Sequence, residues 1–132
     1  NTNQTNMFNI IFIDPPTTDG IKYINDKQFN PQFKKIYKSN LELIITPDKQ
    51  LLNTHKILVL TYIIIGEPIS EENIQYKIDY YNKLFKNNKS IDIQPIHIEK
   101  EQIKLKVKTG NPHYLHLVKT KQVIVLINKF IN

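Results

Sequence analysis

The chain has 132 residues, enough for one domain with a hydrophobic core, and its formal net charge of +6 at pH 7 comes from lysine. It contains no cysteine, which excludes disulfide bonds and thiolate metal sites. The longest apolar run, residues 57–65, is far shorter than the roughly 20 residues that span a bilayer, and the first 13 residues lack the basic start of a targeting peptide. We therefore expect a soluble chain that is encoded where it works or is already trimmed.

The amino-acid usage indicates a strongly AT-biased genome. Arginine, alanine and tryptophan are absent, whereas isoleucine, lysine and asparagine, whose codons are rich in A and T, are heavily used. Such usage fits an organelle, a parasite or a large virus. Because part of the lysine excess then reflects mutation, the pI of about 9.4 is weaker evidence for a nucleic-acid partner than it would be in a balanced proteome.

Residues 1–55 predict an N-terminal extension without chemistry of its own. Residues 8–13 and 41–46 are short apolar runs that each end at a proline turn, so we expect two strands that pack on the body of the protein. Residues 17–30 are typical of a loop. Residues 32–38 predict two turns of helix, because the preceding proline is favoured at the first helical position.

Residues 56–132 predict the body of the fold. The run 56–65 is apolar on both faces, which favours a covered central strand, and residues 123–127 predict a second one. Apolar residues recur at helical spacing over residues 74–85, and Ser70 is the expected N-cap of this helix. The alternating pattern of residues 91–98 slips by one position at a proline, which is typical of a bent edge strand.

A basic hairpin is expected over residues 98–115. Between residues 103 and 108 the apolar side chains alternate with Lys104, Lys106 and Lys108, so one strand face carries a lysine stripe with a repeat of about 7 Å. Such a stripe suits a row of phosphates, although an ordinary solvated surface gives the same pattern. The element order predicts an α+β fold, a ferredoxin-like antiparallel sheet with one main helix and a long basic β-hairpin.

The order of three short motifs resembles the family of the tenth protein of the small ribosomal subunit, which is called NusE in bacteria. These motifs are the Gln94-Pro95-Ile96-His97-Ile98 segment, the basic run over residues 100–107, and the turn Asn111-Pro112-His113. The segment from Lys119 to Val125 is similar to the lysine-rich third strand of plant mitochondrial members. The resemblance covers residues 56–127 and implies a ferredoxin-like body whose hairpin contacts rRNA.

The chain departs from the family pattern at several positions. The family glycine is Gln94, two family prolines are His97 and Glu99, and the family serine is Asn111. The family continues with a helix and a fourth strand that this sequence lacks, which leaves strand 57–65 with an open edge. We expect residues 8–13, residues 41–46 or a partner chain to pair with that edge.

No motif in the sequence supports catalysis or a cofactor. The three glycines and three serines lie in no phosphate loop or nucleophile elbow, and His113 with His116 lacks a third metal ligand. We therefore expect no enzyme, no cofactor, no metal and no small-molecule substrate. Tyr114 suits a core position or base stacking equally well, while Tyr76 and Tyr80 share a helix face that could meet a neighbouring protein.

The resemblance implies a structural constituent of the small ribosomal subunit head that serves mitochondrial translation and is organelle-encoded. Its partners would be rRNA and neighbouring head proteins. The other class of function is a protein–protein interaction or structural module of an AT-rich virus or parasite, with no RNA role. The residues expected to bind RNA are Lys100, Lys104, Lys106, Lys108, Lys119, Lys121, His97, His113 and Asn111.

Overall fold

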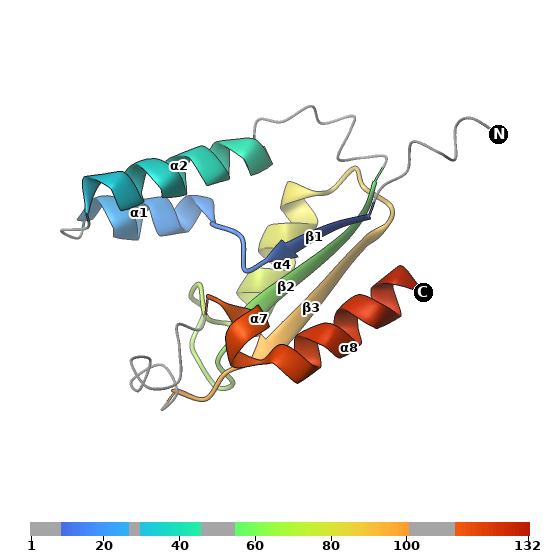
Figure 1. Cartoon of the computed structure of the whole chain (residues 1–132). Helices are drawn as coiled ribbons and strands as arrows, with labels where there is room; N and C mark the ends of the chain where they lie inside the picture. The colour runs from blue at the N-terminus through green and yellow to red at the C-terminus, as the bar shows by residue number, and fades with distance from the viewer. Residues whose placement is uncertain (1–8, 27–29, 46–54, 101–112) are drawn as a thin grey trace.

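The computed structural model describes residues 9–26, 30–45, 55–100 and 113–132 (Figure 1). These residues form a sheet with helices packed on it. In chain order the elements are β1 (Asn9–Ile13), α1 (Thr18–Asp26), α2 (Pro31–Ile45), β2 (Lys56–Ile63), α4 (Ile74–Leu84), β3 (Ile91–His97), α7 (Leu115–Val118) and α8 (Thr120–Ile131).

The described strands form one parallel sheet in the order β1-β2-β3. β1 pairs with β2 in the register Ile10↔Ile57, and β2 pairs with β3 in the register Val59↔Ile93. Strand β2 lies in the centre and every residue after Lys56 in it is buried, as expected for a strand that is covered on both faces. The predictions of a covered central strand here and of an edge strand are therefore confirmed, the latter for Ile91–His97. The predicted slip at the proline is wrong, because the register continues through Thr61↔Pro95.

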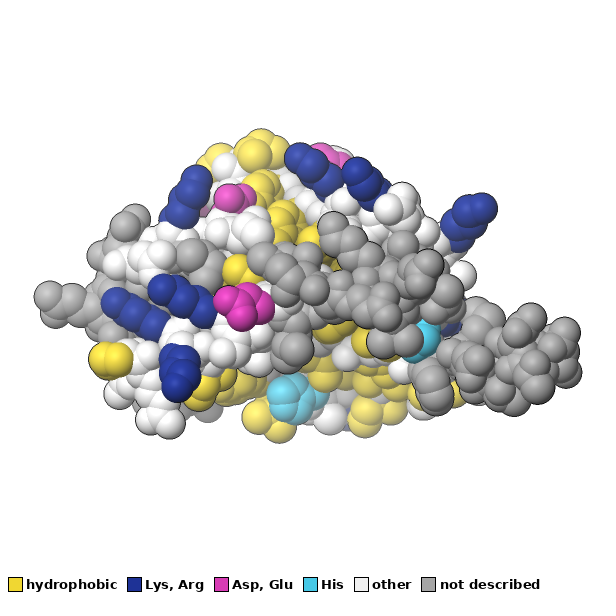
Figure 2. Space-filling model, turned by 90° about the horizontal axis from the view of Figure 1, so that it is seen from above, with side chains coloured by type: hydrophobic (Ala, Val, Ile, Leu, Met, Phe, Trp, Pro, Cys, Tyr) yellow, Lys and Arg dark blue, Asp and Glu magenta, His cyan; other side chains and the backbone are white. Residues whose placement is uncertain are grey.

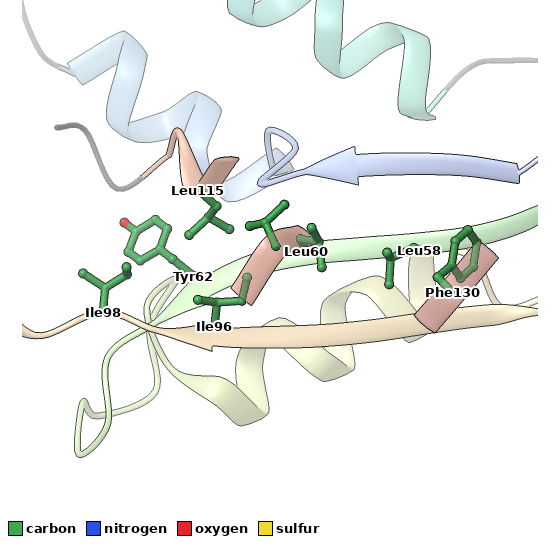
Figure 3. Packing of buried hydrophobic residues seen from close by; sticks show 8 residues of the cluster. Leu58, Leu60, Tyr62, Ile96, Ile98, Leu115 and Phe130 are labelled. Carbon is green, nitrogen blue, oxygen red and sulfur yellow. The ribbon is translucent and has the colours of Figure 1, made fainter. Parts of the chain in front are cut away.

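Alternate side chains of β2 enter two separate hydrophobic clusters. Leu58, Leu60 and Tyr62 point to the face that α7 and α8 cover, where Figure 3 shows them packed beside Leu115 and Phe130. The intervening side chains of β2 face the other cluster. That cluster contains Ile44 of α2, Ile57, Val59, Tyr81 of α4 and the adjoining Phe85.

The elements thus form three layers, with α4 on one face of the sheet and α8 on the other (Figure 1). Helices α1 and α2 lie on the side of β1. The connection from β2 through α4 to β3 is a βαβ unit, since both strands are parallel and adjacent.

The predicted ferredoxin-like antiparallel sheet is wrong, because both strand pairs are parallel. The strand–helix–strand order was predicted correctly. The alternation of side chains within one strand does not show which strand it pairs with or in which direction. Residues 123–127 are helical, within α8. Val123, Leu126, Ile127 and Phe130 follow helical spacing and pack on the sheet, and a short apolar run does not distinguish a strand from a buried helix segment.

Two further element predictions are wrong. Residues 41–46 belong to α2 up to Ile45, where Leu41 and Ile44 are buried three positions apart, a helical spacing. Residues 17–30, expected to form a loop, contain α1. The predicted hairpin over residues 98–115 lies mostly outside the described residues, and its last residue is the first residue of α7.

The structure answers two further expectations about the chain path, one on strand pairing and one on the start of α4. The open edge of strand 57–65 is paired by β1, so the predicted pairing with residues 8–13 is confirmed for Asn9–Ile13. Helix α4 begins at Ile74 rather than after Ser70. Its N-cap is Asn73, whose side-chain oxygen accepts a hydrogen bond from the backbone N–H of Tyr76 at 3.0 Å.

Candidate functional site at the carboxyl edge of the sheet

The carboxyl ends of all three strands meet at one edge of the sheet, because the strands are parallel. In open α/β sheets this edge is the usual place for a ligand. Here β1 is followed by Asp14, β2 by the loop that leads to Asn73, and β3 by residues 98–100. His113 lies two residues before α7 and reaches the same edge through its contact with Asp14.

Asp14 is held in an uncommon backbone conformation beside β2. Its φ of 45° lies in the left-handed region, which few residues other than glycine adopt, although aspartate and asparagine are enriched there. Its backbone N–H donates to the Leu60 carbonyl at 2.6 Å. Its carboxylate accepts hydrogen bonds from the Thr61 hydroxyl at 3.1 Å and the Tyr62 backbone N–H at 3.3 Å. The end of β1 is thereby fixed to β2.

The Asp14 carboxylate also contacts two basic side chains. The Lys77 Nζ atom lies 3.7 Å from Asp14 Oδ1, and the side chains of these two residues are only 6% and 3% exposed. The other oxygen, Oδ2, contacts His113 Nδ1, whose side chain is 58% exposed. A buried carboxylate is thus joined to a buried ammonium group from α4 and to an imidazole at the surface.

Tyr62 forms the wall of this cluster. Its ring meets His113 edge-on, with 5.1 Å between ring centroids, and the Lys77 ammonium lies 5.0 Å from its ring centroid. The hydroxyl donates to Glu72 Oε2 at 3.2 Å. Burial raises the pKa of Tyr62 far above its ordinary value, and the nearby negative charges of Glu72 and Asp14 raise it further. Tyr62 therefore stays a neutral hydrogen-bond donor.

The loop between β1 and α1 is anchored by tyrosine hydroxyls. Tyr81 donates to the Pro15 carbonyl at 3.1 Å, and Tyr80 accepts from the Thr18 backbone N–H at 2.9 Å. The Tyr37 hydroxyl accepts from the Thr17 backbone N–H at 3.1 Å. Burial raises the pKa of both Tyr37 and Tyr81, so these phenols too remain neutral.

Thr17 completes the start of α1. Its hydroxyl accepts a hydrogen bond from the Gly20 backbone N–H at 3.0 Å and donates to Glu71. A side chain at Gly20 would collide with the Tyr37 hydroxyl, which explains a glycine inside this helix. Because these first backbone N–H groups are bound by the protein's own side chains, the start of α1 does not present them to an anion.

The carboxyl edge is acidic although the whole chain is basic. Glu71 and Glu72 join Asp14 there, and Glu67 in the same loop pairs with Lys100 at 3.0 Å. Such surroundings favour a ligand with hydroxyl or amino groups over a phosphate. Within the described ranges no group of three histidine or acidic residues is arranged to hold a metal ion, and no helix has the length and apolar character needed to cross a membrane.

The residues predicted to bind RNA are dispersed over different elements or lie outside the described residues. Lys119 precedes α8 and Lys121 lies in its first turn, so neither is on a hairpin strand. His97 ends β3, with Nε2 2.9 Å from Glu99 and with a buried Nδ1 that has no hydrogen-bond partner among the described residues. Lys100 is the residue already paired with Glu67. The residues outside the described ranges are Lys104, Lys106, Lys108 and Asn111.

His113 is the predicted residue that the structure brings into a polar cluster, whereas Asp14 and Lys77 were missed. Asp14 was interpreted only as part of a turn. Lys77 carried a detectable signal, because it lies three residues after Ile74 and four before Tyr81, within the apolar face of α4. A lysine in such a face is rarely buried unless it is paired.

Comparison with protein-family models, with curated proteins and with solved structures finds no match to this chain.

Proposed function

We propose that the carboxyl edge of the sheet is a ligand site in which His113 exchanges a proton with a small polar molecule. The observation that carries this proposal is the contact between the buried Asp14 carboxylate and the exposed His113 imidazole, which come from positions 99 residues apart. A strained residue that holds a titratable group at a strand end is typical of functional sites.

The geometry assigns each group a role. The Asp14 carboxylate only accepts hydrogen bonds, so it favours the tautomer of neutral His113 that carries its proton on Nδ1. The lone pair then lies on Nε2, the atom that takes the proton from a substrate. His113 is the proposed acid–base residue, and Asp14 is a positioning residue that fixes the tautomer and orientation of its imidazole.

The substrate class follows from the neighbouring charges. Glu71 and Glu72 disfavour a phosphate or carboxylate ligand and accept hydrogen bonds from hydroxyl or amino groups. We therefore infer a neutral or cationic substrate with several hydroxyl or amino groups. Tyr62, which remains protonated, bounds the site on the side of β2.

Hydrolysis of 4-nitrophenyl acetate tests the acid–base role without knowledge of the substrate. His113 would take a proton from water as the water oxygen attacks the ester carbonyl. The ester C–O bond then breaks, 4-nitrophenolate leaves, acetic acid is formed, and His113 returns its proton to the solvent. We expect His113→Gln to reduce the rate above background by at least about tenfold, and Asp14→Asn to reduce it in the same direction.

His116→Gln is the matched control, because His116 is an exposed histidine of α7 whose ring contacts Tyr114. It should keep the wild-type rate. Equal rates for the wild-type protein and His113→Gln, or equal losses for the two histidine variants, would contradict the proposal.

The rRNA-binding function stays a prediction, as do the head proteins as partners and the mitochondrial location. The expected absence of enzymatic activity is untested, and the acid–base proposal replaces it. The rRNA-binding prediction is supported by the net charge of +6 and by the motif order, and its lysine stripe lies wholly outside the described residues. The interaction module of an AT-rich virus or parasite likewise stays an untested alternative.

A further inference from the structure

A groove of about 660 Å³ runs along the outer side of α4 toward the start of α1. Its volume lies within the usual range for small-ligand sites. Figure 2 shows hydrophobic side chains with lysines and acidic groups beside them along the upper edge of the molecule, on the side of α4. Its lining residues are Thr18, Asp19, Ile69, Tyr76, Asp79, Tyr80, Lys83, Leu84 and Lys86.

Two tyrosines give the groove an aromatic wall. The rings of Tyr76 and Tyr80 are nearly parallel, with an interplanar angle of 17° and 6.3 Å between centroids. Tyr80 is fixed by the hydrogen bond from the Thr18 backbone N–H and by an edge-on contact with Tyr81 at 5.1 Å. A wall that is already ordered loses little conformational freedom when a flat ring packs against it.

The Tyr76 hydroxyl is an unexplained polar group at this wall. The atom is buried and has no hydrogen-bond partner among the described residues. Buried polar groups in native proteins are nearly always paired, so an unpaired one calls for a partner such as water, an ion or a ligand. Tyr76 is also one of the residues that line the groove.

The charges along the groove are ordered. Lys83 lies in the last turn of α4 and Lys86 lies two residues after its end, and both are exposed. Asp19 in the first turn of α1 and Asp79 in the middle of α4 lie on the groove as well. The groove thus combines cationic groups, flat rings and carboxylates that accept hydrogen bonds from hydroxyls.

We propose that this groove binds a nucleotide, either free or as part of a single strand. The lysines contact the phosphate, a tyrosine ring stacks on the base, and a carboxylate accepts from the ribose hydroxyls. A nucleotide thus offers one partner each to the lysines, the tyrosine rings and the carboxylates of the groove. The site is separate from the acid–base cluster around Asp14, whose carboxylates disfavour a phosphate, so the two proposals stand or fall independently.

The test measures binding of two probes to the full chain: adenosine 5′-monophosphate by calorimetry and a fluorescein-labelled ten-nucleotide oligoadenylate by anisotropy. Tyr76→Leu should weaken binding by about tenfold, because stacking on one ring contributes that much. Lys83→Gln/Lys86→Gln should lower the salt slope for the oligonucleotide by about 1.4, the value for two phosphate contacts on a single strand.

The control is Lys35→Gln/Lys38→Gln, which removes two exposed lysines at the same spacing from helix α2. It should leave both affinities unchanged. Tyr76→Phe keeps the ring and loses only the hydroxyl, so it should lose less affinity than Tyr76→Leu, which separates loss of stacking from loss of folding. Binding of both probes identifies a free nucleotide as the ligand, and binding of the oligonucleotide alone identifies a strand.

The proposal is overturned if neither probe binds. It is also overturned if Tyr76→Leu and Lys83→Gln/Lys86→Gln bind like the wild type, or if the control loses as much affinity as the groove variants, because binding would then reflect net charge alone.

Discussion

The carboxyl edge of the sheet and the groove along α4 both contain lysine, aspartate and tyrosine side chains, but these differ in burial and in pairing. At the edge, Asp14 and Lys77 are buried against each other, and the Tyr62 and Tyr81 hydroxyls donate to acceptors within the protein. In the groove the lysines are exposed and the Tyr76 hydroxyl is buried without a described partner. The edge therefore stabilises the fold as well as presenting His113, whereas the exposed lysines of the groove contribute little to stability.

This difference determines how each region tolerates change. A buried charge that loses its partner leaves the other charge desolvated, so substitutions at the edge destabilise the protein strongly. Substitutions of the exposed groove lysines remove solvated charges, which usually change the free energy of unfolding by less than about 0.5 kcal/mol. Measurements of unfolding can therefore separate the two regions without any ligand.

The largest expected effect comes from Asp14→Ala. It leaves the Lys77 ammonium buried without its carboxylate and removes the acceptor of the Thr61 hydroxyl and the Tyr62 N–H. We expect a loss of about 3–5 kcal/mol in the free energy of unfolding, measured by urea denaturation.

The double variant Asp14→Asn/Lys77→Met is the control for this effect. Asparagine tolerates the left-handed backbone of position 14 and keeps the shape of the side chain, while methionine removes the buried charge. It should cost less than Asp14→Ala alone. If the double variant is the less stable of the two, the buried ion pair does not account for the role of Asp14.

The second effect is a loss of stability at high pH. Burial raises the pKa of Tyr62 and of Tyr81 above the value of about 10 for an unfolded tyrosine. The unfolded chain then releases a proton above pH 10 that the folded protein keeps, so this stability is complete below pH 10 and decreases as the pH rises further. We expect a decrease of about 1.4 kcal/mol per pH unit for each of the two tyrosines.

Urea denaturation between pH 8 and pH 11 measures this slope. Tyr62→Phe should reduce the slope by the share of one tyrosine. If Tyr62→Phe keeps the wild-type slope, the pKa of Tyr62 is the same in the folded and unfolded protein, and Tyr62 is then not buried as described.

The sequence predicted those elements whose pattern is local. The strands at Asn9–Ile13, Lys56–Ile63 and Ile91–His97 and the helix α4 each carry their own period, and each was placed within a few residues. Whether two strands run parallel depends on the path between them, which no single strand encodes. The β-branched run inside α8 was interpreted as a strand because its helical face becomes visible only when the window extends to Phe130.

The site was less predictable for the same physical reason. Asp14 and Lys77 are 63 residues apart, and their contact exists only because α4 packs on β2 and β3, which brings Lys77 to the end of β1. His113 was singled out as an expected RNA-binding residue, and its contact with a carboxylate 99 positions earlier followed only from the fold. The lysines of the expected stripe alternate clearly with apolar residues, but such alternation does not show which partner, if any, binds the charged face.

The smallest expected effect compares the same substitution in the two regions. Tyr81→Phe removes the donor to the Pro15 carbonyl in a fully buried environment and should reduce the free energy of unfolding by about 1–2 kcal/mol. Tyr76→Phe removes a hydroxyl that has no described partner, so it should leave stability unchanged or raise it slightly. Urea denaturation of both variants measures the difference. Equal losses would mean that the Tyr76 hydroxyl is paired within the folded chain, and the argument from an unpaired hydroxyl toward a groove ligand would then fail.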